Sequence, residues 1–559
     1  MRFLDEKKGL SRRTFLKAVG MGAAGAAGIG SAGLLAACSK PVVSEEDPAP
    51  TQGVTDTPTG TAPAEASDWL GSAPAIAEAD IAHIEDTDIV VIGSGAAGSF
   101  AAVGALEKGA KVVVLEKHST FHNGGSSVSF LNSNYQLSHG APKLDPTQLL
   151  YAYIRGVQHG CDFSLIAKWA YQSGAIFDYI VEHIIEPAGD RLEIKLVDQT
   201  TGDPELDDFY NTYLEIGTPG GNSMAEGLGP FLGVVHEFIA GKGGDIRYNT
   251  RAHKLLQDAT GRVSGVIAQD ESGAYYQLNA LKAVVVCTGS YGSNEAMTTE
   301  FQSPRIASLF KDMNVYPMMM QQPPAEPLDT GDGHLMLCWA GAEMEERTHG
   351  YNGWVVGSAP GFPFLMVNQA ARRFTNEAQS ILMLPPTVVE QPGTPISSWK
   401  ILDADYATVG MGNCMDPNET IKEDQLASGI QADHIEDLAE MMGVNPETLK
   451  ATVDRYNELC EKGFDEDFGK LPKYLKPVKT PPFYADVEMA MMAVTLGGVK
   501  VGHDLQVLNA AGEAIGGVYA AGNTVGRRFG WNYEAECYGM TNALGITHGF
   551  IAGQNAAGA

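Results

Sequence analysis

The chain has 559 residues, of which 44% are hydrophobic, and its formal net charge is −30 at pH 7. A chain of this length folds as roughly two or three domains with sizeable cores. Its acidity argues against nucleic-acid binding, because neutralising phosphates needs a basic surface. The cysteines include no C-x-x-C pair, so we predict no zinc ribbon, no C-x-x-C-H haem attachment and no other metal site.

The first 38 residues have the pattern of a targeting segment rather than of a folded domain. Ser11-Arg12-Arg13-Thr14-Phe15-Leu16-Lys17 resembles a twin-arginine export signal, and a weakly apolar stretch follows it. Leu35-Ala36-Ala37-Cys38 is similar to a lipoprotein cleavage box and predicts a lipid anchor on Cys38. An uncleaved membrane helix and ordinary cleavage without a lipid are the alternatives. We therefore expect export in the folded state and anchoring on the outer side of the cytoplasmic membrane.

Residues 39–80 are rich in Pro, Thr, Ala and acidic residues and contain few large apolar side chains. Such a segment cannot bury enough surface to offset the entropy of folding. The composition predicts a disordered linker that tethers the folded body to its anchor.

A dinucleotide-binding fingerprint follows the linker. Residues 88–92 have the pattern of a buried parallel strand, Gly93-Ser94-Gly95-Ala96-Ala97-Gly98 matches G-x-G-x-x-G, and residues 99–108 fit a helix. A second apolar strand, residues 111–115, ends on Glu116. This order of strand, glycine turn, helix, strand and acid is the context that the motif requires.

Each part of the fingerprint has a predicted role in binding. Gly93 permits the tight turn, Gly95 lets the pyrophosphate approach, and Gly98 permits close packing of helix on strand. The first helical turn, which includes Ala97, presents free N–H groups to the phosphates. Glu116 would accept hydrogen bonds from the adenosine ribose.

Three later segments favour FAD over NAD as the dinucleotide. A second glycine cluster, Gly124-Gly125-Ser126, comes soon after Glu116-Lys117. An apolar strand at residues 283–287 leads into Thr288-Gly289, and a late strand at residues 516–521 leads into Gly522-Asn523. A simple NAD dehydrogenase would not need these three segments, so we predict FAD.

At this point the body from Asp88 onward resembles the fumarate reductase and succinate dehydrogenase flavoprotein family, with urocanate reductases and 3-ketosteroid dehydrogenases as nearer relatives. Besides the flavin segments above, the matches include Tyr248-Asn249-Thr250, Thr330-Gly331-Asp332-Gly333, Arg373-Phe374-Thr375-Asn376-Glu377, Leu496-Gly497-Gly498-Val499 and Ala520-Ala521-Gly522-Asn523. The resemblance implies that Ala252 and Asp332 also lie in the FAD site. It also implies that Arg373 and Glu377 have a structural role first.

The resemblance also implies the fold class and domain order. We expect an α/β fold, with a Rossmann-like FAD-binding domain and an inserted α+β capping domain. The FAD-binding domain would comprise residues 81–345 and 494–559. The capping domain would comprise residues 346–493, where helical patterns at 433–442 and 446–462 appear without the apolar strand runs seen earlier.

The chain departs from the family pattern at positions that handle dicarboxylates. Ile381 stands where the fumarate-reducing members have an arginine proton donor, and Val494 stands before T-x-G-G in place of their histidine. Their N-R-L-G-G segment is replaced by a longer one, residues 526–539, which we call the C-terminal wall. These differences disfavour fumarate and succinate as substrates.

The C-terminal wall is the predicted active-site segment. It contains Tyr538 and Tyr533, either of which could donate a proton, and Arg527, which could hold a substrate carboxylate or carbonyl. The alternatives are that these tyrosines pack in the core and that Arg527 pairs with Glu534 or Glu536. His118 and His122 raise covalent flavin attachment, but their spacing differs from that of the covalent members, so we predict non-covalent FAD.

The sequence thus predicts an FAD-dependent reductase of an activated carbon–carbon double bond, acting on an enoate or aryl acrylate. Its electrons would come from an external cytochrome or quinol-linked protein, because no haem or iron–sulfur motif is present in the sequence. A 3-ketosteroid-type dehydrogenase is the first alternative. A lipoprotein that binds a ligand without catalysis is the second.

Overall fold

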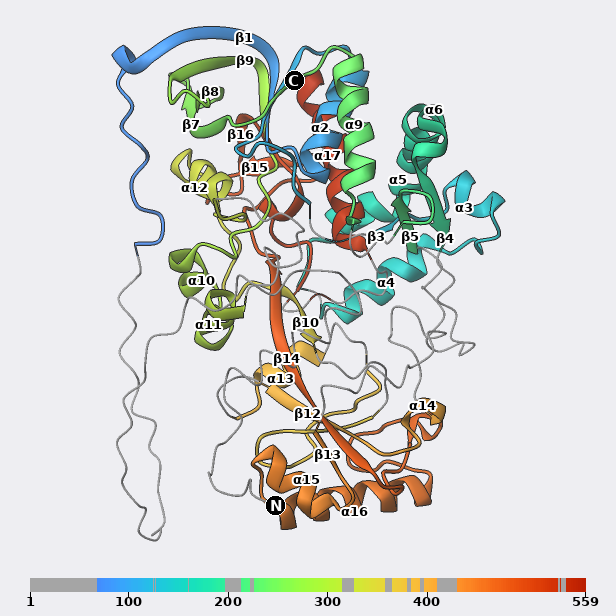
Figure 1. The fold of residues 1–559 in the computed structure, drawn as a ribbon. Helices are drawn as coiled ribbons and strands as arrows, with labels where there is room; N and C mark the ends of the chain where they lie inside the picture. Colours follow the sequence, from blue (N-terminus) through green and yellow to red (C-terminus); the bar gives the residue numbers. More distant parts are fainter. Residues whose placement is uncertain are drawn as a thin grey trace.

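The computed structural model describes residues 68–123, 125, 127–158, 160–196, 213–221, 226–313, 326–356, 364–379, 384–392, 397–409, 430–530, 533 and 539–559. The predicted signal segment, most of the predicted linker, Cys38, Gly124, Ser126, Ile381 and Tyr538 lie outside this part of the chain. The described residues form an α/β fold with sheets of eight, five and three strands, which confirms the predicted fold class (Figure 1).

The eight-stranded sheet carries the dinucleotide fingerprint. Its strands run in the order β15-β16-β9-β1-β2-β6, and β7 and β8 join it at β9. The pairs from β16 to β6 are parallel, whereas β15 and the β7–β8–β9 hairpins are antiparallel. The strands are β1 (Ile81–Ile92), β2 (Val112–Leu115), β6 (Asp245–Arg247), β7 (Arg251–Gln257), β8 (Val263–Gln269), β9 (Tyr275–Val286), β15 (Gln506–Leu508) and β16 (Ala514–Ala520).

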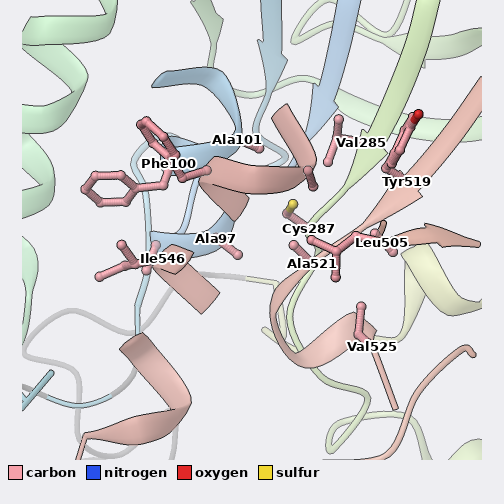
Figure 2. Close-up of a cluster of buried hydrophobic side chains, with 14 of the residues drawn as sticks. Ala97, Phe100, Ala101, Val285, Cys287, Leu505, Tyr519, Ala521, Val525 and Ile546 are labelled. Atoms are coloured by element: carbon pink, nitrogen blue, oxygen red, sulfur yellow. The ribbon is translucent and has the colours of Figure 1, made fainter. Parts of the chain in front are cut away.

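The two helices α2 (Ala96–Glu107) and α17 (Met540–Gly558) pack on this sheet with unusually close backbones. A Cβ atom on Gly549 would lie 2.1 Å from the carbonyl oxygen of Ala97, and one on Gly553 would lie 2.0 Å from that of Ala101. Glycines at these positions therefore let the last helix of the chain press against the fingerprint helix. Figure 2 shows the result, with Ala97 and Phe100 of α2 beside Ile546 of α17 in one buried cluster.

A helical layer and a small sheet complete the part of the molecule around this core. The three-stranded sheet has the order β3-β5-β4, formed by β3 (Ser127–Ser129), β5 (Tyr213–Gly217) and β4 (Glu193–Leu196). The helices are α3 (Asn134–Ser138), α4 (Pro146–Gly156), α5 (Phe163–Ile180), α6 (Glu186–Ala188), α9 (Gly229–Gly241), α10 (Glu295–Phe301), α11 (Pro304–Met313) and α12 (Asp332–Trp339).

The five-stranded sheet is the centre of the second half of the fold. Its order is β10-β14-β12-β11, with β13 also paired to β14, and all of these pairs are antiparallel. The strands are β10 (Tyr351–Val356), β11 (Leu365–Val367), β12 (Ser397–Leu402), β13 (Ile430–Ala432) and β14 (Phe483–Thr495). The helices are α13 (Leu384–Val389), α14 (Tyr406–Val409), α15 (Ile435–Met442) and α16 (Pro446–Lys462).

This half contains buried strands that do not stand out in the sequence as apolar runs. All six residues of β12 are buried although their sequence, SSWKIL, is half polar, and Lys400 in this strand pairs with Glu488 of β14. Polar residues that are paired inside the fold hid the strand from a search for apolar runs. Strand β14 continues to Thr495, and Ile306, Leu309 and Phe310 of α11 share a core with Tyr351 and Met492.

The end of the predicted linker packs against the fold. The ring of Trp69 contacts that of Phe301 with centroids 4.8 Å apart, and Nε1 of Trp339 donates to the carbonyl oxygen of Leu70. The disordered linker predicted for residues 39–80 therefore does not extend over Trp69 and Leu70. Among the described residues, no helix is both long enough and apolar enough to cross a membrane.

Candidate functional site

The fingerprint turn has the tight geometry that a phosphate site requires. A Cβ atom on Gly98 would lie 1.9 Å from the carbonyl oxygen of Gly93, and one on Gly93, where φ is +97°, would lie 2.4 Å from that of Cys287. Gly95 caps α2, so the N–H groups of Ala97 and Gly98 fall in the first turn, where helical geometry offers them no acceptor. The turn thus presents donors and a partial positive charge to an anion.

A buried histidine holds this turn in place. Nε2 of His236 lies 3.1 Å from the carbonyl oxygen of Ser94 and 2.8 Å from Oγ of Ser99, and Nδ1 lies 2.6 Å from the hydroxyl of Tyr248. Because a carbonyl only accepts, Nε2 carries the proton and Nδ1 accepts from Tyr248. Burial lowers the pKa of His236 to about 4, so the ring is neutral at pH 7.

Glu116 lies at the end of β2, where the sequence predicts the ribose acid. Its carboxylate accepts from N and Oγ of Ser94, at 3.1 and 2.9 Å, and from the backbone N–H of His118 at 3.0 Å. Burial raises the pKa of Glu116. Glu116 is therefore fixed against the fingerprint turn, beside the place where a bound dinucleotide carries its ribose.

Lys117 and Asp332 are brought together next to Glu116. Nζ of Lys117 donates to Oγ1 of Thr330 at 2.7 Å and lies 3.4 Å from Oδ2 of Asp332, which also accepts from Arg251 at 2.9 Å. Burial acts to raise the pKa of Asp332, but the two cations lower it below its usual range. Ala252 follows Arg251 in β7 and is buried. These residues form one charged cluster at the ribose end of the site.

The second glycine cluster meets the start of α17. Asn542 donates from Nδ2 to the carbonyl oxygen of Ser127 at 2.9 Å and accepts from Asn123 at 3.3 Å. Gly125 has φ of +78°, and its added Cβ would lie 3.2 Å from Nδ2 of Asn542. Asn123, Gly125 and Ser127 therefore lie beside the first turn of the last helix.

The two late flavin segments also lie against each other. The backbone N–H of Thr288 donates to Oγ1 of Thr524 at 3.0 Å. Gly289 has φ of +80°, and Gly522 has φ of +71° with room for no more than a hydrogen, because a Cβ would lie 2.8 Å from that of Ala97. The short 3₁₀ turn Gly522–Thr524, which we call the flavin turn, thus passes directly over the start of α2.

The sequence-predicted cofactor residues in the described part of the chain therefore converge on one cradle. It begins at the positive end of α2, passes Glu116 and the charged cluster on one side, and reaches the flavin turn and the start of α17 on the other. Glycines stand where the surrounding segments approach so closely that a Cβ atom would collide with neighbouring protein atoms. A dinucleotide with a second ring system beyond its phosphates fits this donor set, as FAD requires.

The C-terminal wall departs from the prediction at Arg527. Its side chain is exposed and its φ is +54°. Its backbone N–H donates to Oε2 of Glu345 at 2.6 Å, and its carbonyl oxygen accepts from the backbone N–H of Asp162 at 2.6 Å. Arg527 therefore acts through its backbone in a tight turn and does not point into the core. Its neighbour Arg528 is the arginine that does, with a side chain that is fully buried.

Arg528 and Tyr533 form the buried part of this wall. Arg528 donates from Nε to the carbonyl oxygen of Val525 and from Nη2 to Oδ1 of Asn523, both at 2.8 Å, and Nη1 has no partner. Burial lowers the pKa of Arg528 to about 10, so it keeps its charge at pH 7. Tyr533 is buried, and its hydroxyl accepts from the backbone N–H of Thr541 at 3.3 Å.

A second buried polar group lies where the two large sheets meet. The hydroxyl of Tyr291 lies 2.6 Å from Nδ1 of His349, whose Nε2 lies 3.1 Å from the carbonyl oxygen of Glu345. Burial lowers the pKa of His349 to about 4 and that of His334, whose ring contacts Tyr291, to about 3. Burial raises the pKa of Glu345 to about 7.

No sequence pattern singled out Glu345 or the Tyr291–His349 pair, or indicated that Arg528 of the C-terminal wall is the buried arginine and Arg527 the exposed one. Adjacent side chains of an extended segment point to opposite sides, so one buried and one exposed arginine could have been expected at 527–528. Which of them is buried depends on the left-handed backbone of Arg527, which no sequence pattern indicates. Glu345 and His349 stand alone in the sequence, and only the approach of residues 495–498 gives them a role.

The position before T-x-G-G, where the sequence departs from the family pattern, lies in the β10–β14 strand pair of the second sheet. Val494, which replaces the histidine before T-x-G-G, pairs with Asn352 across β10 and β14. The side-chain oxygen Oδ1 of Asn352 is buried without a hydrogen-bond partner. This end of the second sheet therefore presents an amide and a methyl-bearing side chain, and no cation from this pair.

Arg373 and Glu377, the predicted architectural residues, lie deep in the second half of the fold. Arg373 pairs with Glu377 at 2.8 Å and with Asp465 at 2.8 Å, and Lys470 joins Glu377 at 3.0 Å. This network fixes α16 and the loop after it to the segment that follows β11. In this buried network the two cations, Arg373 and Lys470, balance the two carboxylates of Glu377 and Asp465.

Comparisons with known proteins agree with the geometry. Residues 88–539 match the family described as an FAD binding domain. A probable fumarate reductase of Shewanella frigidimarina, Ifc3, is 26% identical over 85% of this chain and 75% of its own length. The urocanate reductase of Eggerthella lenta is 26% identical over 88% of this chain and 78% of its own length.

A solved structure has the same fold. The 3-ketosteroid-Δ4-(5α)-dehydrogenase of Rhodococcus jostii RHA1 superposes with a TM-score of 0.66 at 22% identity, over 84% of this chain and 97% of that one. The glycine cradle, the ribose acid and the family match point to the same cofactor, FAD, in an oxidoreductase that acts on carbon–carbon bonds. This chain belongs to the family of flavoproteins that share this FAD binding domain.

Proposed function

We propose that this chain is an FAD-dependent reductase of a carbon–carbon double bond conjugated to a carbonyl or carboxylate, with an enoate or aryl acrylate as substrate. Relatives named as fumarate reductase and urocanate reductase support this reaction class. The observation that carries the proposal is that a buried cation, Arg528, interacts electrostatically with a buried tyrosine, Tyr533. Arg528 is bonded to the flavin turn, and the hydroxyl of Tyr533 accepts from the start of α17.

These two side chains supply what the reaction needs from the protein. FAD, when bound, supplies a hydride to the β-carbon, and an acid must then protonate the α-carbon. The tyrosinate left behind at Tyr533 is stabilised by the hydrogen bond from Thr541 and by the positive charge of Arg528. Tyr538, outside the described residues, is the other candidate acid.

The pocket chemistry favours a substrate other than a dicarboxylate. The Asn352–Val494 pair offers no cation where the fumarate-reducing members have a histidine before T-x-G-G. Arg527 is exposed and does not replace it. A planar substrate with a single carbonyl or carboxylate fits this set better than fumarate does.

The proposal includes the place of the protein in the cell. The twin-arginine pattern and Cys38 support export in the folded state and a lipid anchor on the outer side of the cytoplasmic membrane. An external cytochrome or quinol-linked protein would then deliver the electrons, because the described residues contain no group of side chains that could hold a metal ion.

The test is turnover of FAD-loaded protein with a reduced viologen dye. We would add a panel of enoates, aryl acrylates, fumarate and ketosteroids, and follow re-oxidation of the dye. Turnover with enoates or aryl acrylates and none with fumarate is expected, and Tyr533→Phe should lower kcat at least tenfold if it is the acid. Turnover of ketosteroids with an artificial electron acceptor, without any reductase activity, would instead establish a 3-ketosteroid-type dehydrogenase.

A further inference from the structure

Arg528 is a buried cation without a hydrogen-bonded carboxylate. Its side chain is completely removed from solvent, its bonded partners are neutral oxygens of Val525 and Asn523, and Nη1 has none. In the part of the chain that the structure describes, no acid forms an ion pair with it. Leaving a charge buried without a counter-ion is costly, so the folded protein holds Arg528 there against a large penalty.

The nearest described acid does not neutralise this charge. Glu345 interacts electrostatically with Arg528, but its carboxylate accepts from the backbone N–H groups of Gly498 and Arg527. Burial also raises the pKa of Glu345 to about 7, so a large fraction of it is protonated near neutral pH.

The position of Arg528 relates it to the ring end of the cofactor. It is bonded to Asn523 in the flavin turn and to Val525 directly after that turn. Arg528 therefore lies on the chain just beyond the point where Gly522 of the flavin turn approaches Ala97 of α2. Its charge lowers the pKa of His334 in α12 and of His548 in α17, the helices that bound this end of the cradle. The phosphates have their own donors in α2, so Arg528 is left for another anion.

From this arrangement we propose that Arg528 is the counter-ion of the reduced flavin ring and raises the reduction potential of the bound FAD. The oxidised ring is neutral. Taking up two electrons and one proton from outside leaves it with one net negative charge. A fixed buried cation stabilises that charged form and leaves the neutral oxidised form unaffected. The inference depends on FAD binding and not on the identity of the substrate.

The test is a spectroelectrochemical titration of FAD-loaded protein without substrate. Arg528→Met should shift the equilibrium between oxidised and reduced flavin at least tenfold toward the oxidised form, which is about 30 mV for a two-electron couple. Arg528→Lys, which keeps the charge, should restore most of that shift. Arg527→Met, which removes an exposed charge one residue away, is the matched control and should change the equilibrium less than about twofold.

A second readout separates charge from structure. The midpoint potential depends on pH with one proton per two electrons where the reduced ring is an anion, and with two protons where it is neutral. The break between these slopes should move to higher pH in Arg528→Met and stay in place in Arg527→Met. If Arg528→Met does not retain FAD, Arg528→Gln, which keeps a donor for Asn523, takes its place.

Three results would overturn the proposal. One is an Arg528→Met protein whose midpoint potential, and the pH at which its slope changes, equal those of the wild type. Another is a midpoint potential that falls as far in Arg528→Lys as in Arg528→Met, which would assign the effect to hydrogen-bond geometry and not to charge. The third concerns Glu534 and Glu536, outside the described residues: if Glu534→Gln/Glu536→Gln favours the reduced flavin at least tenfold, these acids are the counter-ions of Arg528.

Discussion

The hydroxyl of Tyr291 donates a 2.6 Å hydrogen bond to Nδ1 of His349, joining the segment after β9 to the segment that enters the second sheet. Nε2 of His349 faces the carbonyl oxygen of Glu345, which can only accept, so Nε2 carries the ring hydrogen. Nδ1 is then an acceptor, and the hydroxyl of Tyr291 is its donor. Both side chains are buried.

We expect Tyr291→Phe to lower the free energy of unfolding by about 1–3 kcal/mol, the cost of leaving a buried acceptor unpaired. Tyr171 is the exposed control: its hydroxyl forms one side-chain hydrogen bond, with Thr147, whereas the buried hydroxyl of Tyr291 bonds to both His349 and Gln302. Tyr171→Phe should change stability by less than about 0.5 kcal/mol. Urea unfolding of the two variants checks this; equal losses would mean that the Tyr291 bond contributes nothing particular.

The buried histidines predict loss of stability in acid. Burial lowers the pKa of His236, His349 and His548 to about 4 and that of His334 to about 3. The folded protein keeps them neutral, whereas the unfolded chain takes up protons below about pH 6.5, so their contribution is present above pH 6.5 and is lost as the pH falls toward 4. The loss is on the order of 3 kcal/mol for each histidine at most.

Glu345 acts in the opposite direction over the same range. Its raised folded pKa of about 7 gives a contribution that is present below about pH 4.5 and is lost as the pH rises to 7. The buried acids Glu116, Asp329 and Glu488, whose pKa values burial also raises, act in the same direction as Glu345. His118, whose pKa burial lowers to about 4, acts with the other histidines. Unfolding free energies measured in urea at pH 7 and pH 5 isolate the part of the fall that one histidine causes. His548→Gln should reduce that fall, whereas His183→Gln, at an exposed position, should not.

The fingerprint turn leaves no room for a methyl group at Gly98, where a Cβ would lie 1.9 Å from the carbonyl oxygen of Gly93. Gly98→Ala should therefore open the turn and abolish FAD retention, giving colourless protein. Gly241→Ala, also in a helix but with open space around its Cβ, should keep the full flavin absorbance. A yellow Gly98→Ala protein with a wild-type flavin content would contradict the assignment of this turn to the phosphates.

Two arginines that each pair with more than one acid differ strongly in burial. Arg373 is 6% exposed and pairs with Glu377 and Asp465, whereas Arg455 is 42% exposed and pairs with Glu466 and Asp467. Arg373→Met should cost about 3–5 kcal/mol, because it leaves buried carboxylates without their cation. Arg455→Met should cost less than about 1 kcal/mol. Thermal unfolding of both variants measures the difference.

The proposed lipid anchor is tested by fractionation. Cys38→Ala should move the exported protein from the membrane fraction to the soluble envelope fraction while it keeps its FAD. Replacing both Arg12 and Arg13 by lysine should instead keep the protein inside the cell, because the export signal depends on the arginine pair. A Cys38→Ala protein that stays in the membrane fraction would favour an uncleaved helix.

The sequence was sufficient for the parts of the molecule that rest on local pattern. Glycine spacing and two apolar strands predicted the fingerprint turn and the position of Glu116, since both depend on residues close in sequence. The late segments at Thr288 and Gly522 were also placed correctly at strand ends. The FAD cofactor followed from these segments and is confirmed by the family match.

The catalytic side could not be predicted in the same way. Arg527 was chosen over Arg528, and the difference lies in one left-handed residue whose conformation is set by Glu345 and Asp162, far away in sequence. The buried strand β12 was missed because Lys400 and Glu488 neutralise each other only after the sheet has formed. The roles of Tyr533 and Tyr538 stay predictions.

The 13-residue strand β14 has a mechanical consequence. It runs the length of the second sheet and ends at Thr495, directly before Gly497 and Gly498. Thr495 pairs with Tyr351 at the start of β10, and the N–H of Leu496 donates to the carbonyl oxygen of Gly350, so the chain enters and leaves the second sheet at one point. Any tilt of that sheet toward the FAD cradle would pivot here, with β14 as the lever arm. The Glu345 carboxylate, bonded to both Gly498 and Arg527, would then couple the pivot to the C-terminal wall.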